Sequence, residues 1–157
     1  MIILGIDPGS NFCGYGILEI EKGKIVAAGC DVIKVKKTLT LPEKLNEIHK
    51  VISNVIDEYK PDIAAVESIF YGKNIHSAFT LGHARGAILL ALAQKKIPIS
   101  DYSPREVKKS VVGNGNASKE QVHYMVQKIL NLKIKPALYD ASDALAVALC
   151  QFNKERF

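Results

Sequence analysis

The sequence contains no tryptophan, and only three cysteines and two methionines stand among its 157 residues. The cysteines, Cys13, Cys30 and Cys150, are odd in number and far apart, which argues against a disulfide framework and against the ligand spacing of a zinc site. We therefore expect buried thiols that act as small hydrophobic groups in a protein of the reducing cytoplasm.

Long apolar runs are also missing. The strongest run, Gly86 to Ala93, falls well short of the roughly 18 residues that a membrane span requires. The N-terminal residues lack the basic region and the cleavage site of a signal peptide. With 48% apolar and 24% charged residues, the composition is that of a globular protein, and we expect one domain over residues 1–157 without a membrane partner.

Basic residues are unevenly spread along the chain. From Lys95 to Lys135 there are nine Lys and Arg against three Asp and Glu, a net charge of +6, whereas the remaining residues carry −1. A basic cluster is the electrostatic footprint of a nucleic-acid-binding protein. On charge alone, a basic face that serves only solubility explains it equally well.

Periodicity and capping signals predict alternating strands and helices. Apolar runs predict five strands, over Ile2–Ile6, Gly14–Glu19, Lys24–Val32, Ile63–Glu67 and Ile97–Tyr102. Capping boxes open three helices, and two further helices are expected; the five begin near Thr40, Asn74, Ser103, Ser118 and Tyr139. Three strands followed by this alternation imply a mixed sheet with helices on its faces.

Four carboxylates lie at the ends of predicted elements. Asp7 ends the first strand, Glu67 ends the fourth, and Asp140 and Asp143 share one face of the last helix. Each has an ordinary explanation in turn chemistry, strand termination or the helix dipole. If the first and fourth strands are neighbours and the last helix crosses them, the four acids converge and require cations. An all-oxygen cluster suits Mg²⁺ or Mn²⁺ rather than zinc.

An ordered set of motifs runs from Met1 to about Cys150. Its members are Gly5-Ile6-Asp7-Pro8-Gly9-Ser10, Glu67-Ser68-Ile69-Phe70, Lys73-Asn74, Leu81-Gly82-His83-Ala84-Arg85-Gly86, Tyr102-Ser103-Pro104, Val107-Lys108, Val111-Val112-Gly113-Asn114-Gly115, Lys119 and Asp140-Ala141-Ser142-Asp143-Ala144-Leu145-Ala146. In this order they resemble the RuvC family of bacterial Holliday-junction resolvases. Some members of that family carry histidine where this chain has Asp140.

The resemblance implies an α/β, RNase H-like fold, whose five-stranded mixed sheet has its first three strands antiparallel and is flanked by helices. It implies a Mg²⁺-dependent crossover junction endodeoxyribonuclease that resolves four-way junctions by paired symmetric nicks in recombination and repair, leaving 5′-phosphate and 3′-hydroxyl ends. The matching catalytic acids, which hold two ions about 4 Å apart with Mn²⁺ as a substitute, are Asp7, Glu67, Asp140 and Asp143. No other cofactor is expected, and no side chain is a covalent nucleophile.

The same resemblance suggests DNA contacts. Phe70 matches an aromatic residue that stacks on an unpaired base, while Lys108 and Lys119 match basic residues that hold phosphates. Asn74, in the Lys73-Asn74 motif, is a further candidate. Core packing for Phe70 and a solvated helix face for the lysines are the plain alternatives. We interpret the histidines as structural or surface residues; they are His49, His76, His83 and His123.

The expected partners are four-way junction DNA, a second copy of the chain and the RuvA–RuvB branch-migration complex. A junction has two strands to cut about an approximate two-fold axis, which a homodimer with two sites matches. The candidate interface is the helix from Asn74 to Lys96, on the face that carries Ala78, Leu81, Arg85 and Leu89. The same face would also suit packing against the sheet.

Two other functions are considered. Asp7-Pro8-Gly9-Ser10 also suits an actin-like phosphotransferase or ATPase, but that fold needs a duplicated core and a second phosphate loop, for which 157 residues leave no room. A non-catalytic RNase H-like DNA-binding protein is the second, although such a protein gains nothing from four acids near phosphates. Incubation with a four-way junction with and without Mg²⁺ distinguishes binding from cleavage.

Overall fold

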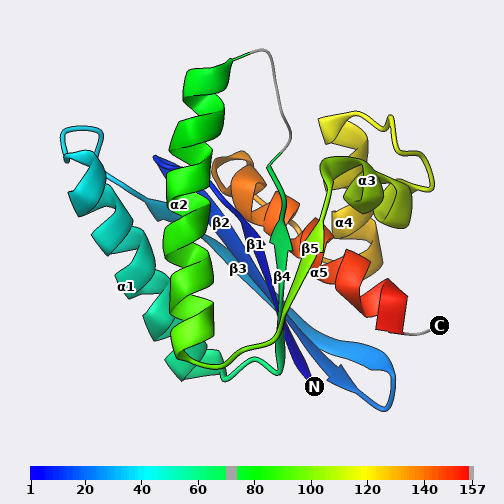
Figure 1. Ribbon diagram of the computed structural model, residues 1–157. Coiled ribbons are helices and arrows are strands. Elements are labelled where there is room, and N and C mark those ends of the chain that lie inside the picture. Colours follow the sequence, from blue (N-terminus) through cyan, green and yellow to red (C-terminus); the bar gives the residue numbers. More distant parts are fainter. Residues whose placement is uncertain (70–73, 156–157) are drawn as a thin grey trace.

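A single mixed sheet forms the centre of the computed structural model, which describes residues 1–69 and 74–155 (Figure 1). The strands lie in the order β3-β2-β1-β4-β5, with antiparallel pairing among β1, β2 and β3 and parallel pairing of β1 with β4 and of β4 with β5. Their bounds are Ile2–Asp7 for β1, Phe12–Glu21 for β2, Lys24–Lys34 for β3, Ile63–Glu67 for β4 and Ile99–Tyr102 for β5. The predicted five-stranded mixed sheet is confirmed.

Helices cover both faces of this sheet (Figure 1). On one face lie α1 (Leu41–Tyr59) and α2 (Ile75–Gln94); on the other lie α3 (Pro104–Val112), α4 (Lys119–Leu130) and α5 (Tyr139–Glu155). The predicted capping boxes at Thr40, Ser103 and Ser118 are all present. A short 3₁₀ turn over Pro136–Leu138, which was not expected from the sequence, leads into α5. None of the helices in the described part of the chain is long and apolar enough to cross a membrane.

The sheet separates two hydrophobic cores because successive side chains of a strand point to opposite faces. In β1, Ile3 belongs to the core under α3, α4 and α5, whereas Leu4 belongs to the core under α1 and α2. Both residues are fully buried, so β1 is a central strand whose ends are fixed from both sides. Cys13 and Cys150 are buried and Cys30 is half-buried, and all three are free thiols, in agreement with their interpretation as small hydrophobic groups.

Glycines allow α5 to lie directly on β1 and β2. A Cβ atom added to Gly14 would stand 2.0 Å from the carbonyl oxygen of Asp140, and one added to Gly5 would stand 2.1 Å from that of Ala144. Real Cβ contacts are never so short, so only glycine permits this approach of helix to sheet. Gly14 is also the residue that pairs with Asp7 across the β1–β2 ladder. The first turn of α5 is therefore fixed directly above the end of β1.

The outward face of α2 differs from the predicted interface. The predicted residues are half-buried: Arg85 donates to the backbone carbonyl of Glu67 and forms an ion pair with Asp101, and Leu89 packs on the core beneath α2. The large exposed apolar residues of this helix are instead Ile75, Phe79 and Leu90. The large exposed apolar residues of α2 therefore differ from the predicted set, and the choice of interface residues stays a prediction.

Candidate active site

Strand pairing brings the first two predicted acids together. Because β1 and β4 are parallel neighbours, with Ile6 beside Val66, their final residues Asp7 and Glu67 reach the same edge of the sheet. Their carboxyl groups are close enough for each to shift the pKa of the other. Arg85 of α2 donates from its Nε to the Glu67 carbonyl oxygen at 3.3 Å, which fixes the end of β4 from the opposite face.

The first turn of α5 supplies the other two acids. One carboxylate oxygen from each of Asp7, Asp140 and Asp143 lies within 4.8 Å of the other two, a separation that one cation can bridge. Asp140 and Asp143 lie three residues apart, so they share the helix face that rests on Gly14. All four predicted acids therefore gather in one place.

Crowding and burial disfavour negative charge at this place. Burial raises the pKa of Asp7 well above its usual value, and the nearby acids Glu67, Asp143 and Asp140 add to the effect. Burial also raises the pKa of Glu67. A divalent cation would remove this repulsion, because each carboxylate would then face a positive charge. The donors are all oxygens, so the residues present fit a hard ion such as Mg²⁺ or Mn²⁺.

A cavity of about 350 Å³ opens in front of the acids. Asp7, Glu67 and Asp143 line one part of it, and the two predicted lysines, Lys108 of α3 and Lys119 of α4, line another. Nζ of Lys119 lies 3.3 Å from Oδ2 of Asp143, and the charge of Asp143 raises the pKa of this lysine. The cavity thus places carboxylates beside basic side chains.

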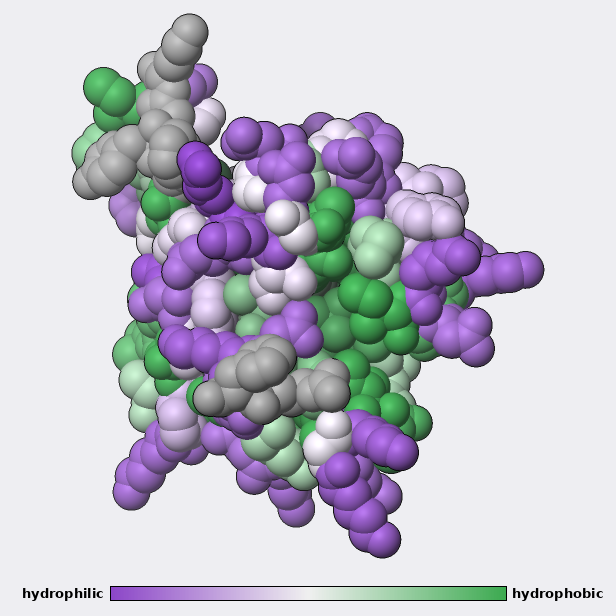
Figure 2. All heavy atoms as spheres, turned by 90° about the vertical axis from the view of Figure 1, so that its right-hand side faces the viewer, coloured by the Kyte–Doolittle hydropathy of each residue, from purple (hydrophilic) through white to green (hydrophobic). Residues whose placement is uncertain are grey.

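Part of the basic segment predicted from the sequence lies at this cavity. Lys108 and Lys119 belong to it, and α3 and α4 lie on the side of the molecule that Figure 2 turns toward the viewer. Hydrophilic side chains project around an apolar area on this side (Figure 2). A polyanion that approached here would meet positive charge before it reached the acids.

Two predicted DNA-binding residues are not placed at the cavity. Asn74 caps α2, where its side chain accepts a hydrogen bond from the backbone N–H of Ser77 at 3.3 Å, and it is exposed. It is absent from the described residues that line the cavity. Phe70 lies outside the residues that the structure describes.

His123, which we interpreted from the sequence as a structural or surface residue, contacts one of the acids. This residue of α4 is only 5% exposed, and its Nε2 lies 2.9 Å from Oδ1 of Asp143. Its ring also contacts that of Tyr139, with centroids 4.4 Å apart. The available signal was its position four residues after Lys119, which places both side chains on one face of α4.

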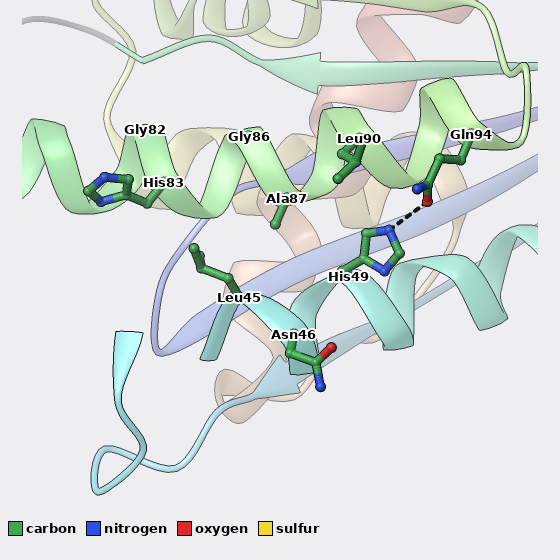
Figure 3. A pocket seen from close by; sticks show the side chains of 9 residues that line it. All are labelled: Leu45, Asn46, His49, Gly82, His83, Gly86, Ala87, Leu90 and Gln94. Atoms are coloured by element: carbon green, nitrogen blue, oxygen red, sulfur yellow. Dashed lines mark hydrogen bonds between the residues drawn. The ribbon is translucent and has the colours of Figure 1, made fainter. Parts of the chain in front are cut away.

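A second hollow lies on the opposite face of the sheet, between α1 and α2 (Figure 3). Its volume is about 600 Å³, and His49 of α1 reaches across it to Gln94 of α2 at 2.8 Å. Gly86, with open space where a Cβ would stand, and Leu90 form much of its α2 wall. No acid of the cluster lines it.

Comparison with known proteins identifies relatives of the whole chain. The family model for crossover junction endodeoxyribonuclease RuvC matches residues 3–151. Curated proteins of that name include one from Idiomarina loihiensis, 50% identical over 99% of this chain and 89% of its own length, and one from Ehrlichia canis, 47% identical over the full length of both. The solved structure of Thermus thermophilus RuvC in complex with Holliday junction substrate has a TM-score of 0.90 at 33% identity, covering 99% of this chain and 95% of that chain. The predicted RNase H-like fold is confirmed by this similarity.

Proposed function

This chain belongs to the RuvC family of crossover junction endodeoxyribonucleases, and from this premise we propose that it resolves four-way DNA junctions by hydrolysing a phosphodiester bond in each of two strands. The observation that carries the proposal is the convergence of four acids beside two lysines at one cavity; the acids are Asp7, Glu67, Asp140 and Asp143. The T. thermophilus relative solved with Holliday junction substrate supports the choice of DNA.

We assign the four acids to two Mg²⁺ ions, for which Mn²⁺ substitutes. When bound, the ions supply an activated water and stabilise the charge on the leaving 3′ oxygen. For the acids to bind them, Asp7 must give up the proton that burial and its acidic neighbours favour. Attack on phosphorus in line with the 3′ oxygen breaks the bond to that oxygen, which leaves a 3′-hydroxyl and a 5′-phosphate end.

Lys108 and Lys119 hold the phosphates of the strand that is cut. Both line the cavity that the acids line, so a phosphate bound by them lies next to the carboxylates. Lys119 is paired with Asp143 in the structure, but its own side chain is 62% exposed, so solvent weakens the pair. Its ammonium group is therefore free to exchange that carboxylate for a phosphate when DNA and cations bind.

Phe70 and Asn74 remain proposed DNA contacts. Asn74 needs a test that separates its cap from its contact with DNA, because loss of a helix cap alone costs about 1 kcal/mol. Replacement of Asn74 by Ser keeps a capping hydroxyl and shortens the side chain. Reduced junction affinity in a variant that melts like the wild type then assigns the contact to DNA.

The proposed active unit is a homodimer that acts with the RuvA–RuvB complex on chromosomal junctions in the cytoplasm. The exposed apolar residues of α2, Phe79 and Leu90, offer the surface for a second copy, together with the hollow in Figure 3. A partner there would lie on the opposite face of the sheet from the acids. Two open sites would then be available to two strands.

Cleavage of an end-labelled four-way junction tests the proposal. We expect symmetric nicks in Mg²⁺, nicks that a DNA ligase reseals, and little turnover in Ca²⁺, whose coordination is larger and looser. Asp7→Asn and Glu67→Gln should abolish the nicks and leave junction binding intact or tighter, because these acids bind cations and repel phosphate. Binding without nicks by the wild type would support the non-catalytic alternative, and equal loss of binding and cleavage in the variants would make the two acids structural.

A further inference from the structure

The carboxylate of Asp143 is held through both of its oxygens by residues of α4. Oδ1 lies 2.9 Å from Nε2 of His123, and Oδ2 lies 3.3 Å from Nζ of Lys119. The lysine is 62% exposed at its side chain, whereas the histidine side chain is only 7% exposed. Of the two partners, the histidine is the one that surrounding atoms hold in place.

We propose that His123 is a positioning residue that orients Asp143 for cation binding, an inference that rests on the proposed metal-dependent function. An ionised carboxylate only accepts hydrogen bonds, so Nε2 of His123 is the donor. Fixing Oδ1 restricts rotation of the carboxylate, and its remaining lone pairs stay directed toward the cluster with Asp7 and Asp140. Groups that hydrogen bond to metal ligands in this way tune affinity for the metal.

The imidazole is itself braced against the start of α5. Its ring packs on Tyr139 with centroids 4.4 Å apart and planes inclined by 41°, and Tyr139 directly precedes Asp140. One side chain of α4 thus contacts the helical turn that carries both aspartates. Gln127, one turn further along α4, donates to the His123 carbonyl oxygen at 3.3 Å and accepts from the Ile134 N–H at 2.9 Å, which ties in the segment before α5.

Core packing alone does not account for this residue. A buried polar side chain destabilises the fold unless a partner satisfies it, and an apolar residue would fill the same space without that requirement. Direct ligation is not indicated either, because the described residues whose ligand atoms cluster are Asp7, Asp140 and Asp143. The geometry leaves His123 acting through Asp143.

Two amide replacements of His123 test this role, because they place a donor nitrogen at different distances from Asp143. The side-chain nitrogen of Gln occupies about the position of Nε2, whereas that of Asn occupies about the position of Nδ1. We therefore expect His123→Gln to bind Mn²⁺ within about threefold of the wild type and His123→Asn to bind about tenfold more weakly. Calorimetric titration of the metal-free protein with Mn²⁺ measures both. The Mg²⁺ concentration for half-maximal cleavage should rise by the same factor in His123→Asn.

Matched controls separate orientation from folding. His49→Asn changes a histidine that bonds Gln94 across α1 and α2 and should leave Mn²⁺ affinity unchanged. Junction binding in EDTA should be equal in His123→Gln and His123→Asn, because it requires the fold and no cation. If His123→Asn does not fold, Tyr139→Phe and Tyr139→Ala replace the pair: the first keeps the ring on His123, and the second should weaken Mn²⁺ binding by about threefold or more.

Wild-type Mn²⁺ affinity in a folded His123→Asn, or equally weakened binding in His123→Gln and His123→Asn, would overturn the inference. In either case, the proposed function would still hold if the wild-type protein cuts the junction in Mg²⁺. A wild-type protein that neither binds Mn²⁺ nor cuts the junction would instead overturn the proposed function, and the role of His123 with it.

Discussion

The helices α5 and α2 cover opposite faces of one sheet in opposite ways. Eleven of the seventeen residues of α5 are buried, against four of the twenty residues of α2. Glycines beneath α5 let its backbone rest on the strands, whereas α2 turns Phe79 and Leu90 to solvent. A helix packed on all sides can hold two acids in register with a strand end. A helix with an open apolar face has surface left for a partner.

The two faces also meet at the acids. On one side, Arg85 of α2 donates a hydrogen bond to the backbone carbonyl of Glu67. On the other side, the absence of a side chain at Gly14 lets the backbone of Asp140 approach the sheet closely. The site is thus fixed from both faces, although only the α5 face supplies its cavity.

Gly14→Ala should disrupt the close packing of α5 on the sheet. Its new Cβ would fall on the Asp140 carbonyl, so α5 must move away, at a cost of about 1–3 kcal/mol in the free energy of unfolding. Displacement of about 1 Å at a catalytic group reduces the rate about 100-fold. Cleavage assays and chemical denaturation measure the two effects. Gly29→Ala, where nothing lies within 4 Å, is the matched control and should change neither; equal behaviour of the two variants would contradict the close-packing account.

Leu90→Glu should disrupt the proposed dimer surface on α2 and leave the packing of α5 on the sheet intact. Leu90 is 53% exposed, so the substitution spares the fold, but a buried charge at an interface should raise the dimer dissociation constant about tenfold or more. Sedimentation should show the shift to monomer, and singly nicked junctions should accumulate. Ile129→Glu, at an apolar residue of α4 that is 46% exposed, is the control and should stay dimeric. An unchanged dimer in Leu90→Glu would move the interface elsewhere.

Burial of Asp7 among further acids predicts that the stability of the metal-free protein depends on pH. Because the pKa of Asp7 is raised in the folded protein, the unfolded chain releases this proton first as pH rises from about 4. The folded state then binds more protons, so the metal-free wild type should lose stability with rising pH. Asp7→Asn removes this loss. Thermal melts in EDTA should show the variant gaining on the wild type from pH 4 to pH 8, and Mg²⁺ should stabilise the wild type more. If the melting temperatures of the wild type and Asp7→Asn changed equally with pH, the raised pKa of Asp7 in the folded protein would be contradicted.

Lys119→Ala should give the smallest effect. Loss of one phosphate contact flattens the dependence of log binding constant on log salt by about one unit or less. Lys128→Ala removes a lysine of the same helix that lies over the Tyr124 ring and is not among those lining the cavity. Titration of the junction at several salt concentrations compares them. A flatter slope in Lys128→Ala than in Lys119→Ala would place the phosphate path outside the cavity.

Local signals in the sequence were sufficient for most of the secondary structure. Thr40, Ser103 and Ser118 each carry a capping box, and turn residues or a proline end the strands and helices that were predicted. The acids were found for the same reason, since Asp7 and Glu67 end recognisable strands. Asp7 and Glu67 lie together because β1 pairs with β4. This pairing joins residues far apart in the sequence, so from the sequence we could only assume it.

The parts that sequence reasoning missed depend on facing surfaces. The apolar and small residues of α2 are spread over its whole circumference, so their periodicity did not distinguish the face toward the sheet from the face toward solvent. His123 and Asp143 are twenty residues apart on two different helices, and no spacing rule predicts their contact. Gly14 is an ordinary strand residue until α5 is placed above it.

We propose that the α5 face cuts DNA and that the α2 face pairs two such sites. A supercoiled plasmid with an extruded cruciform tests both at once, because a single nick releases the supercoiling and the junction disappears before a second cut. We predict linear plasmid as the first product in Mg²⁺, from two cuts within one complex. Nicked circles as the only product would contradict the pairing, and intact plasmid would contradict the nuclease site itself.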